Sequence, residues 1–277
     1  MTKWLIRKAI NIIEPVSFFS YQGKEYPVFS SFGGHYKPGD AVVGKQNRFA
    51  KLGKMADKTV KELKENIKLD PLSLNGRLSF ACLLMMLTGI RIGNESSAEG
   101  YVSNLANNAG ETVQTFGVTT LKPEHVQVSE DTLQLNFLGK KQVAQNIKVI
   151  DPVLVDVGKL YLNDKVDPFA ASQTTADTWI GIDIKDLTTF IKQNFGEQMI
   201  PKDLRTFRAN TLFIDLIRDK IDATKVDKKT AKEELKIAIE GVAKGLGNTP
   251  SVTKSAYLDS RALDWYIFQR TEGLTNG

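Results

Sequence analysis

The chain has 277 residues, and its 42% apolar content is ample for a packed core, which excludes an intrinsically disordered protein. Its 37 lysine and arginine residues against 32 acidic ones leave a net charge of +5, a mild excess that fits a polyanionic partner without requiring one. With Cys82 as the only cysteine and no apolar run near the roughly 18 residues of a membrane span, we expect a soluble, cytoplasmic protein without disulfides or a membrane anchor.

The first 45 residues predict a small β-rich domain. Short alternating stretches such as residues 26–29 are followed by turn signals at residues 33–34 and 38–40. The remainder, residues 46–277, predicts a second, mainly helical domain that carries a small antiparallel sheet. The expected fold class is therefore α+β.

Two helices are predicted before the sheet. From Lys51 onward apolar residues recur at helical spacing until Asp and Pro at residues 70–71 end the helix. A second, more buried helix is predicted from about Leu74 to Thr88, with Gly89 where a left-handed cap residue is expected. Arg91 therefore lies just past the end of a buried helix.

A polar stretch and a small sheet follow. Residues 96–115 are polar and small, and they predict an insertion or surface loop without an assigned function. Three alternating stretches between Val126 and Val149 predict the antiparallel sheet. Lys140 and Lys141 fall in the turn between its second and third strands, so at least one lysine should project from a hairpin tip, where it can reach a DNA groove.

The rest of the chain is mainly helical, with segments predicted near residues 154–162, 185–195, 203–221 and 230–246. In the last of these, Thr230 and Glu233 predict a capping box. The run LGNTPSVTKSAY then follows as a Gly- and Pro-punctuated loop, in which Tyr257 stands nine residues after Asn248.

A tyrosine in such a loop is a candidate nucleophile towards phosphorus. Attack on a phosphodiester needs an in-line phenolate, cations around the equatorial oxygens and an acid for the departing alkoxide, and it requires no metal. Tyr257 fits the first role, while Arg91 and Arg205 suit the second because a guanidinium stays charged and matches two phosphate oxygens. Lys140 on its hairpin suits the third role. Asn248 can donate a hydrogen bond to a non-bridging oxygen.

Each of these residues also has a structural interpretation when it is taken singly. Arg91 after a helix is more often a capping or surface ion-pair residue, and Arg205 more often pairs with a neighbouring carboxylate. Lys140 and Lys141 would usually be solvated turn lysines, and Tyr257 a half-buried structural tyrosine. Their joint occurrence favours the catalytic interpretation.

Four blocks of sequence carry this joint occurrence, namely TGIRIGNE at 88–95, FGVTTLKPEHV at 116–126, FLGKKQV at 137–143 with KDLRTF at 202–207, and LGNTPSVTKSAY at 246–257. In this order they resemble the type IB DNA topoisomerases, in the compact form seen in bacteria and poxviruses, and the resemblance covers most of the chain. It implies Arg91 and Arg205 as transition-state arginines, Lys140 as general acid, Asn248 as a phosphate-contacting residue and Tyr257 as the nucleophile. Bacterial members share asparagine at the position of Asn248, whereas poxvirus and nuclear members have histidine.

The resemblance also implies contacts with DNA. The stretch GDAVVGKQNRF at 39–49 is similar to a family segment that touches bases in the major groove. The DNA-binding residues expected from the resemblance are Gln46, Asn47, Phe49, Thr119, Thr120, Lys122, His125, Lys141 and Lys202. Local packing is the alternative for the first three residues, support of a strand is the alternative for His125, and Lys202 either assists near the scissile phosphate or clamps it.

A protein of this family would form a two-domain clamp around double-stranded DNA, with residues 1–45 as a DNA-binding domain and 46–277 as the catalytic domain. It would relax supercoiled DNA through a 3′-phosphotyrosyl intermediate and religation, without ATP, metal or another cofactor. We expect a monomer in the cytoplasm, associated with the nucleoid or, for a viral protein, in the cytoplasm of the host.

Two other interpretations remain open. A tyrosine recombinase shares the nucleophile and the arginines, but its HxxR pattern is missing, because Lys202 stands three residues before Arg205 and the only histidines are His35 and His125. A catalytically silent DNA-binding protein of the same fold is the second alternative. A covalent protein–DNA adduct would exclude it.

Overall fold

A computed structural model describes residues 14–29, 41–163 and 177–271, with all their side chains except those of residues 41–46. The chain divides into two compact units. The terminal unit consists of residues 1–57 and 206–277, and the central unit consists of residues 58–205. The domain boundary expected near residue 45 remains a prediction.

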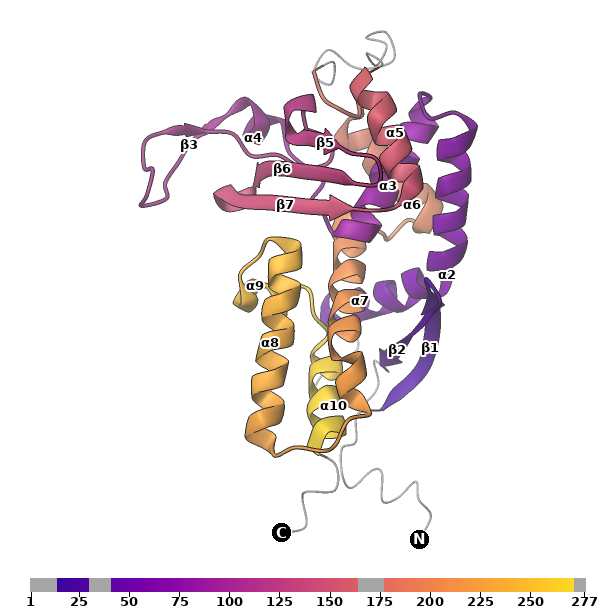
Figure 1. The fold of residues 1–277 in the computed structure, drawn as a ribbon, viewed down its shortest axis with the longest axis vertical. Helices are drawn as coiled ribbons and strands as arrows, with labels where there is room; N and C mark the ends of the chain where they lie inside the picture. Colours follow the sequence, from indigo (N-terminus) through magenta and orange to yellow (C-terminus); the bar gives the residue numbers. More distant parts are fainter. Residues whose placement is uncertain (1–13, 30–40, 164–176, 272–277) are drawn as a thin grey trace. The chain divides into compact units, whose positions relative to one another are not determined.

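The elements confirm a mixed, helix-rich fold with small antiparallel sheets (Figure 1). Two helices contribute residues to both units, α2 (Ala41–Leu69) and α7 (Pro201–Ile221). The other elements of the terminal unit are β1 (Pro15–Tyr21), β2 (Lys24–Phe29), α8 (Lys228–Leu246), α9 (Pro250–Ala256) and α10 (Ser260–Thr271). Those of the central unit are α3 (Leu74–Thr88), α4 (Glu95–Glu99), β3 (Tyr101–Val102), β4 (Thr112–Val113), η1 (Pro123–His125), β5 (Val126–Val128), β6 (Leu133–Gly139), η2 (Lys140–Gln142), β7 (Val143–Val149), α5 (Pro152–Asn163) and α6 (Ile184–Phe195). Within the described ranges no helix is both long and apolar enough to span a bilayer.

Helix α3 forms the buried centre of the central unit. Its first turn is capped by Ser73, whose hydroxyl accepts a hydrogen bond from the backbone N–H of Gly76 at 3.0 Å. It ends at Gly89, whose φ of 72° lies in the left-handed region and whose N–H donates to Met85 O at 2.8 Å. Both predicted ends of this helix are confirmed, and Cys82 within it is fully buried.

The three-stranded sheet expected between Val126 and Val149 is also confirmed. Strands β5, β6 and β7 pair antiparallel in that order, with Leu135 of β6 opposite Val126 on one side and opposite Ile147 on the other. Leu133 of β6 is completely buried. It lies against Gly158 of α5, where an added Cβ would be 3.2 Å from its side chain.

The polar segment 96–115 is more ordered than the expected loop. Asn94 caps the short helix α4 by accepting a hydrogen bond from Ser97 N at 3.2 Å. Strands β3 and β4 then form a hairpin in which Tyr101 pairs with Val113. Each strand has only two residues, which is too short for an alternating pattern to be visible in the sequence.

In the terminal unit, β1 and β2 form a hairpin with a two-residue turn. Gln22 and Gly23 both have positive φ, 51° and 73°, which matches the twist of the strands. The hairpin packs through Phe19, whose ring lies 5.6 Å from that of Phe49 on α2 and 5.9 Å from that of Phe207 on α7. Aromatic packing therefore joins the first strands to two helices.

Helix α2 begins ten residues earlier than the position at which the sequence predicted it. It starts at Ala41 rather than near Lys51, so the segment 41–50 is helical. Gly53 in this helix allows the close approach of β1, because an added Cβ would lie 2.5 Å from the ring of Phe19.

The predicted capping box of α8 is wrong. The N-cap is Asp227, whose carboxylate accepts hydrogen bonds from Lys229 N at 2.8 Å and Thr230 N at 3.0 Å. The helix therefore begins before Thr230, whose hydroxyl donates to the same carboxylate at 2.8 Å. At the other end, Gly247 has a φ of 58° and closes the helix in the left-handed conformation.

The run expected as a loop after α8 contains a helix. Thr249 caps α9 by accepting a hydrogen bond from Val252 N at 3.3 Å. Pro250 occupies the first helical position, where a backbone N–H would have no partner within the helix, so proline is tolerated there. Tyr257 is the C-cap residue of this helix. Threonine followed by proline is typical of a helix start as well as of a turn, so the sequence pattern alone does not distinguish the two.

Candidate active site

Arg91 is placed by the turn that follows α3. The hydroxyl of Thr88 donates to Leu84 O at 2.6 Å and accepts a hydrogen bond from Ile90 N at 3.1 Å, on either side of the left-handed residue Gly89. These bonds fix the backbone at the exit of the helix. Arg91 follows it and is half-buried, as its predicted position just past a buried helix requires.

The Arg91 segment is locked to the block at 116–126. Val118 N donates to Arg91 O at 2.8 Å, and Thr119 N donates to Ile92 O at 2.8 Å. The backbones cross so closely that an added Cβ at Gly117 would lie 2.4 Å from the backbone nitrogen of Gly93. Glycine is therefore needed at this crossing, and two of the four sequence blocks form one substructure.

Thr119 and Thr120 serve this crossing. Both are 3% exposed. The Thr119 hydroxyl donates to Ile92 O at 2.8 Å, and the Thr120 hydroxyl accepts a hydrogen bond from Gly117 N at 3.0 Å. Their hydroxyls hold the Arg91 segment in place, and a direct contact of either residue with DNA remains a prediction.

The other end of the same block reaches the turn that carries Lys140. Phe116 N donates to Leu138 O at 2.8 Å, two residues before Lys140. Residues 116–120 are thus bonded at one end to β6 and at the other to Arg91. In the central unit, the backbones of these two cationic residues are therefore joined through one short segment.

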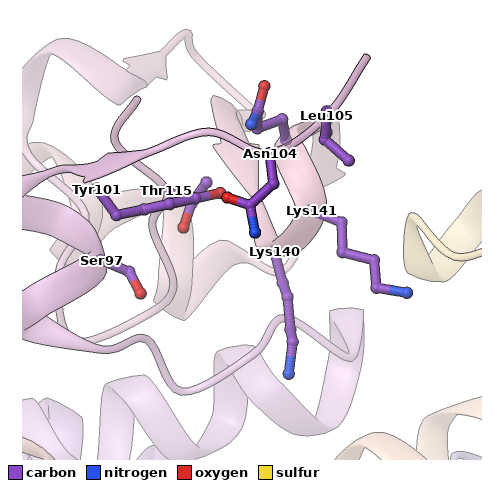
Figure 2. A pocket seen from close by; sticks show the side chains of 8 residues that line it. Ser97, Tyr101, Asn104, Leu105, Thr115, Lys140 and Lys141 are labelled. Atoms are coloured by element: carbon purple, nitrogen blue, oxygen red, sulfur yellow. The ribbon is translucent and has the colours of Figure 1, made fainter. Parts of the chain in front are cut away.

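Lys140 and Lys141 are exposed in η2 between β6 and β7, which confirms the predicted lysine hairpin tip. Figure 2 shows their side chains leaving the same turn in different directions. The turn borders a pocket of about 350 Å³ that is also lined by Ser97, Tyr101, Asn104, Leu105, Thr115 and Gln142.

Arg205 lies near the start of α7 and is 4% exposed. Its guanidinium donates a hydrogen bond to Gly89 O, at the end of α3 and two residues before Arg91. The neighbouring carboxylate of Asp203 accepts a hydrogen bond from Ile200 N at 3.0 Å. The structure therefore brings the guanidinium of Arg205 to the helix end from which Arg91 departs. Lys202 is exposed one turn earlier.

His125 supports the local chain. Its Nδ1 accepts a hydrogen bond from Lys122 N at 3.0 Å, and its ring centroid lies 4.2 Å from that of Phe116. Because Nδ1 is an acceptor, the neutral ring carries its proton on Nε2. Burial lowers the pKa of this histidine, which keeps the ring neutral. Contacts of Lys122 and His125 with DNA remain predictions.

In the terminal unit, Asn248 lies between two helix caps. Gly247 ends α8 in the left-handed conformation, and Thr249 begins α9. The backbone N–H of Asn248 donates to Ala243 O at 2.9 Å, and the residue is half-buried. The helix ends therefore fix the backbone on both sides of this amide.

Tyr257 ends α9 and is 3% exposed. Its N–H donates to Thr253 O at 3.2 Å, and its carbonyl accepts a hydrogen bond from the side-chain amide of Asn210 at 2.9 Å. The same amide donates to Thr206 O at 2.8 Å, and Asn210 Oδ1 accepts from Asp259 N at 2.9 Å. Asn210 was missed in the sequence, where it is an unremarkable polar residue in a helical pattern.

A buried ion pair holds the chain just after Tyr257. The Arg261 guanidinium forms two hydrogen bonds with the Asp259 carboxylate, at 3.0 and 2.7 Å, and both side chains are less than a tenth exposed. Arg261 also donates to Phe29 O at 2.8 Å. A guanidinium that makes two hydrogen bonds to one carboxylate forms a strong ion pair. Because the same guanidinium also binds Phe29 O, it anchors the backbone after Tyr257 to the β1–β2 hairpin.

The proposed base-contacting segment is helical. Gln46 lies in α2, but its side chain lies outside the described residues. Asn47 is exposed, and Phe49 is half-buried against Phe19 and Phe207. Phe49 thus has a packing role within the terminal unit, and base contacts by these three residues remain predictions.

The predicted site residues fall into two groups. The central unit holds Arg91, Lys140 and Arg205, and the terminal unit holds Asn248 and Tyr257. Among the described residues, no group of three or more histidine, cysteine or acidic side chains is arranged to hold a metal ion.

Comparison with known proteins identifies the class to which this arrangement belongs. Residues 40–271 match the family described as "Eukaryotic DNA topoisomerase I, catalytic core". This match covers most of the chain, and the chain therefore belongs to this DNA topoisomerase I family, whose members are type IB enzymes, as the resemblance predicted.

Viral proteins are among its relatives. The chain is 27% identical over 158 residues to "DNA topoisomerase 1B" of Acanthamoeba polyphaga mimivirus, covering 55% of this chain and 47% of the relative. It is 25% identical over 228 residues to "DNA topoisomerase I" of monkeypox virus and to "DNA topoisomerase 1B" of vaccinia virus (strain Copenhagen), covering 79% of this chain and 65% of each relative. The aligned regions thus span about half to two thirds of the relatives.

Proposed function

We propose that this protein is a type IB DNA topoisomerase that relaxes supercoiled duplex DNA by transient cleavage of one strand. The observation that carries the proposal is the segment 116–120, which is hydrogen-bonded to Arg91 at one end and to the strand that leads to Lys140 at the other. A site for phosphoryl transfer needs its cations held in fixed positions before the substrate arrives. The family match supports the same chemistry.

In the proposed reaction, the phenol of Tyr257 loses its proton to solvent, and the phenolate oxygen attacks the scissile phosphorus to form a 3′-phosphotyrosyl bond. Arg91 and Arg205 stabilise the charge on the equatorial oxygens. The P–O5′ bond breaks, and Lys140 donates a proton to the departing 5′ oxygen. Asn248 donates a hydrogen bond to a non-bridging oxygen.

After cleavage, the duplex rotates about the intact strand, and the 5′-hydroxyl then attacks the phosphotyrosine to reseal the nick. Because the phosphotyrosine conserves the energy of the phosphodiester bond, the cycle needs neither ATP nor a metal. Since Tyr257 is only 3% exposed, its hydroxyl must become accessible when DNA binds.

We further propose that the protein acts as a monomeric clamp on double-stranded DNA, with the first 45 residues as a DNA-binding domain. Phosphate contacts would come from exposed lysines such as Lys141 and Lys202. Binding should therefore weaken as salt increases, because each neutralised phosphate releases counterions. The remaining candidates for DNA contact are Gln46, Asn47, Phe49, Thr119, Thr120, Lys122 and His125.

The test is relaxation of supercoiled plasmid in EDTA without ATP, by the wild-type protein and by Tyr257→Phe. A denaturing quench traps any covalent adduct. We expect relaxation and a 3′-linked adduct with the wild type only, whereas Tyr257→Phe should still bind duplex DNA. Relaxation by Tyr257→Phe would reject the nucleophile. Absence of both relaxation and adduct would indicate a silent DNA-binding protein, and an adduct without relaxation would indicate a recombinase.

A further inference from the structure

The β3–β4 hairpin has no role in the chemistry above, but it is attached to the turn of the proposed general acid. The hairpin begins with Tyr101 and is closed by hydrogen bonds from Ser103 N to Glu111 O at 2.8 Å and from Gly110 N to Ser103 O at 2.9 Å. Figure 1 shows it beside the end of the sheet at which β6 turns into β7. That turn carries Lys140.

Three side chains connect the hairpin to the turn in a closed ring of hydrogen bonds. The Ser103 hydroxyl donates to Asn108 Oδ1 at 2.7 Å, Asn108 Nδ2 donates to Gln142 Oε1, and Gln142 Nε2 donates back to Ser103 Oγ at 2.6 Å. Ser103 is 2% exposed, so the ring is shielded from water on that side. Each member both donates and accepts, and its polar atoms are therefore well satisfied.

The turn needs such an attachment because its backbone is strained. Lys141 has φ 62° and ψ 27°, and Gln142 has φ 58°. Consecutive residues other than glycine in the left-handed region cost free energy, and such a conformation persists only where the surroundings impose it. The hydrogen bonds to Gln142 supply that constraint from the hairpin.

We propose that the β3–β4 hairpin positions Lys140, with Ser103, Asn108 and Gln142 as the positioning residues. This inference rests on the proposed function of Lys140. Proton donation requires the ammonium to lie within hydrogen-bond reach of the departing 5′ oxygen, and a displacement of about 1 Å can cost on the order of 100-fold in rate. By holding the strained turn, the hairpin keeps Lys140 in the position from which it donates.

The experiment compares Asn108→Ala with Asn107→Ala. Asn107 is the adjacent residue of the same type, is exposed, and makes no side-chain hydrogen bond within the described part of the chain. Single-turnover cleavage is measured on a duplex with the natural 5′ oxygen and on one with a 5′-bridging sulfur. Sulfur leaves as a thiolate without a proton, so this substrate does not need the acid.

Asn108→Ala should slow cleavage of the oxygen substrate by about tenfold and should leave cleavage of the sulfur substrate nearly unchanged. Asn107→Ala should match the wild type on both substrates. In a Lys140→Ala background, the Asn108→Ala change should cause no further loss, because the residue it positions is already gone. Asn108→Asp, which retains the shape and the acceptor for Ser103, should behave as Asn108→Ala does.

Equal slowing of Asn108→Ala on both substrates, or an additive loss in the Lys140→Ala background, would overturn the proposal, since either result shows a general structural defect. A rate equal to that of the wild type would overturn it as well. Failure of the proposed function looks different, because the wild-type protein itself would then form no adduct on either substrate.

Discussion

The side-chain amide of Asn210 donates a hydrogen bond to the backbone carbonyl of Tyr257 at 2.9 Å, and its oxygen accepts one from Asp259 N at the same distance. One buried side chain of α7 therefore forms hydrogen bonds with the backbone on both sides of Leu258. Because the backbone is held at these two points, the position of the phenol depends on a residue that has no chemistry of its own.

Replacing Asn210 with alanine should lower the free energy of unfolding by roughly 1–3 kcal/mol, because it removes the buried hydrogen bonds to the Tyr257 carbonyl and from Asp259 N. It should also slow formation of the covalent adduct by about tenfold or more, since the nucleophile loses its support. Thermal unfolding and quenched cleavage assays measure the two effects. Asn194→Ala is the control. The side-chain amide of Asn194 in α6 donates to the carbonyl of Phe190, four residues earlier, at 2.9 Å, just as Asn210 in α7 donates to the carbonyl of Thr206. If both variants cleave DNA at the same rate, Asn210 does not position Tyr257.

The features of this arrangement that the sequence predicts are those determined by residues close together in the chain. Gly89 as a left-handed cap and Lys140 in a hairpin turn were predicted because glycine, turn residues and alternating strands act within a few positions of the chain. The capping box at Thr230 was wrong because the helix already begins three residues earlier, where the Asp227 carboxylate accepts hydrogen bonds from Lys229 N and Thr230 N.

The supporting contacts of the site were not predictable in this way. Asn210 and Tyr257 are 47 residues apart, and Asn108 and Gln142 are 34 apart. No periodicity or turn signal links such positions, and only the tertiary structure brings them together. The sequence therefore indicated which groups are suited to the chemistry but not what holds them.

The crossing of the Arg91 segment with the block at 116–126 leads to a second prediction. In Gly117→Ala, the new Cβ would lie 2.4 Å from Gly93 N and 2.6 Å from Arg91 O, where only backbone atoms are available to move. We expect destabilisation of roughly 2 kcal/mol or more and a large loss of cleavage, because Arg91 is displaced.

The matched control for this change is Gly241→Ala in α8. There the new Cβ would meet only the end of the Leu216 side chain, at 2.9 Å, and Leu216 is 43% exposed. Alanine also favours the helix, so stability should stay equal or increase slightly. Denaturant unfolding measures both variants. Normal cleavage by a folded Gly117→Ala protein would show that Arg91 does not depend on this crossing.

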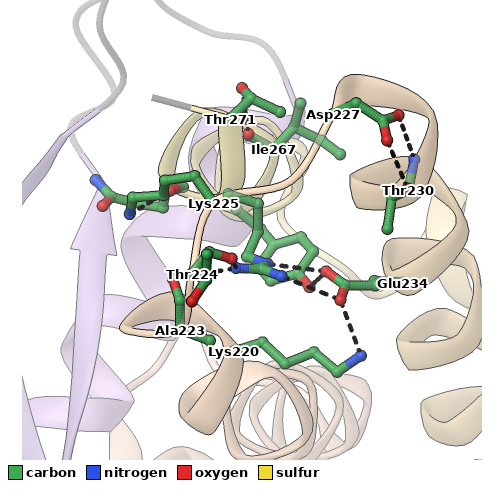
Figure 3. A network of polar contacts seen from close by, with 12 residues as sticks. Lys220, Ala223, Thr224, Lys225, Asp227, Thr230, Glu234, Ile267 and Thr271 are labelled. Atoms are coloured by element: carbon green, nitrogen blue, oxygen red, sulfur yellow. Dashed lines mark hydrogen bonds and ion pairs between the residues drawn. The ribbon is translucent and has the colours of Figure 1, made fainter. Parts of the chain in front are cut away.

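A third prediction concerns the contact between α8, which precedes Tyr257 in the sequence, and α10, which follows it. Glu234 accepts hydrogen bonds at this contact from Arg270 Nε and from the Tyr266 hydroxyl, at 2.8 Å each. The Lys220 ammonium lies 3.3 Å from the same carboxylate, and Figure 3 shows Glu234 with Lys220 in this polar network. The hydrogen bond from Arg270, supported by the other partners, lowers the pKa of Glu234 to about 2. The carboxylate is therefore more stable in the folded protein than in the unfolded chain.

Because the folded pKa lies below the ordinary value of 4.5, this stabilisation is present above about pH 4.5 and is lost as the pH falls towards 2. Glu234→Gln should thus lower the free energy of unfolding by roughly 1–3 kcal/mol at pH 7, and the difference from the wild type should shrink near pH 3. Glu240→Gln on the same helix is the control, because its contact with Lys236 is exposed and 3.9 Å long, and it should have an effect below about 0.5 kcal/mol. A difference that does not change with pH would contradict the assignment.

The last prediction concerns His125, whose folded pKa is lowered below its ordinary value of 6.5 by burial, with Lys122 adding to the effect and Glu124 opposing it. Since the unfolded chain then binds a proton more readily than the folded protein, stability should fall as the pH decreases through 6.5 towards the folded pKa. His125→Asn places an amide oxygen where Nδ1 accepts from Lys122 N and removes the titrating ring. Its free energy of unfolding should therefore change less between pH 7.5 and pH 5.5 than that of the wild type, even though loss of the contact with Phe116 lowers its stability at every pH. Parallel pH profiles for the two proteins in urea unfolding would show that His125 is not held neutral by its burial.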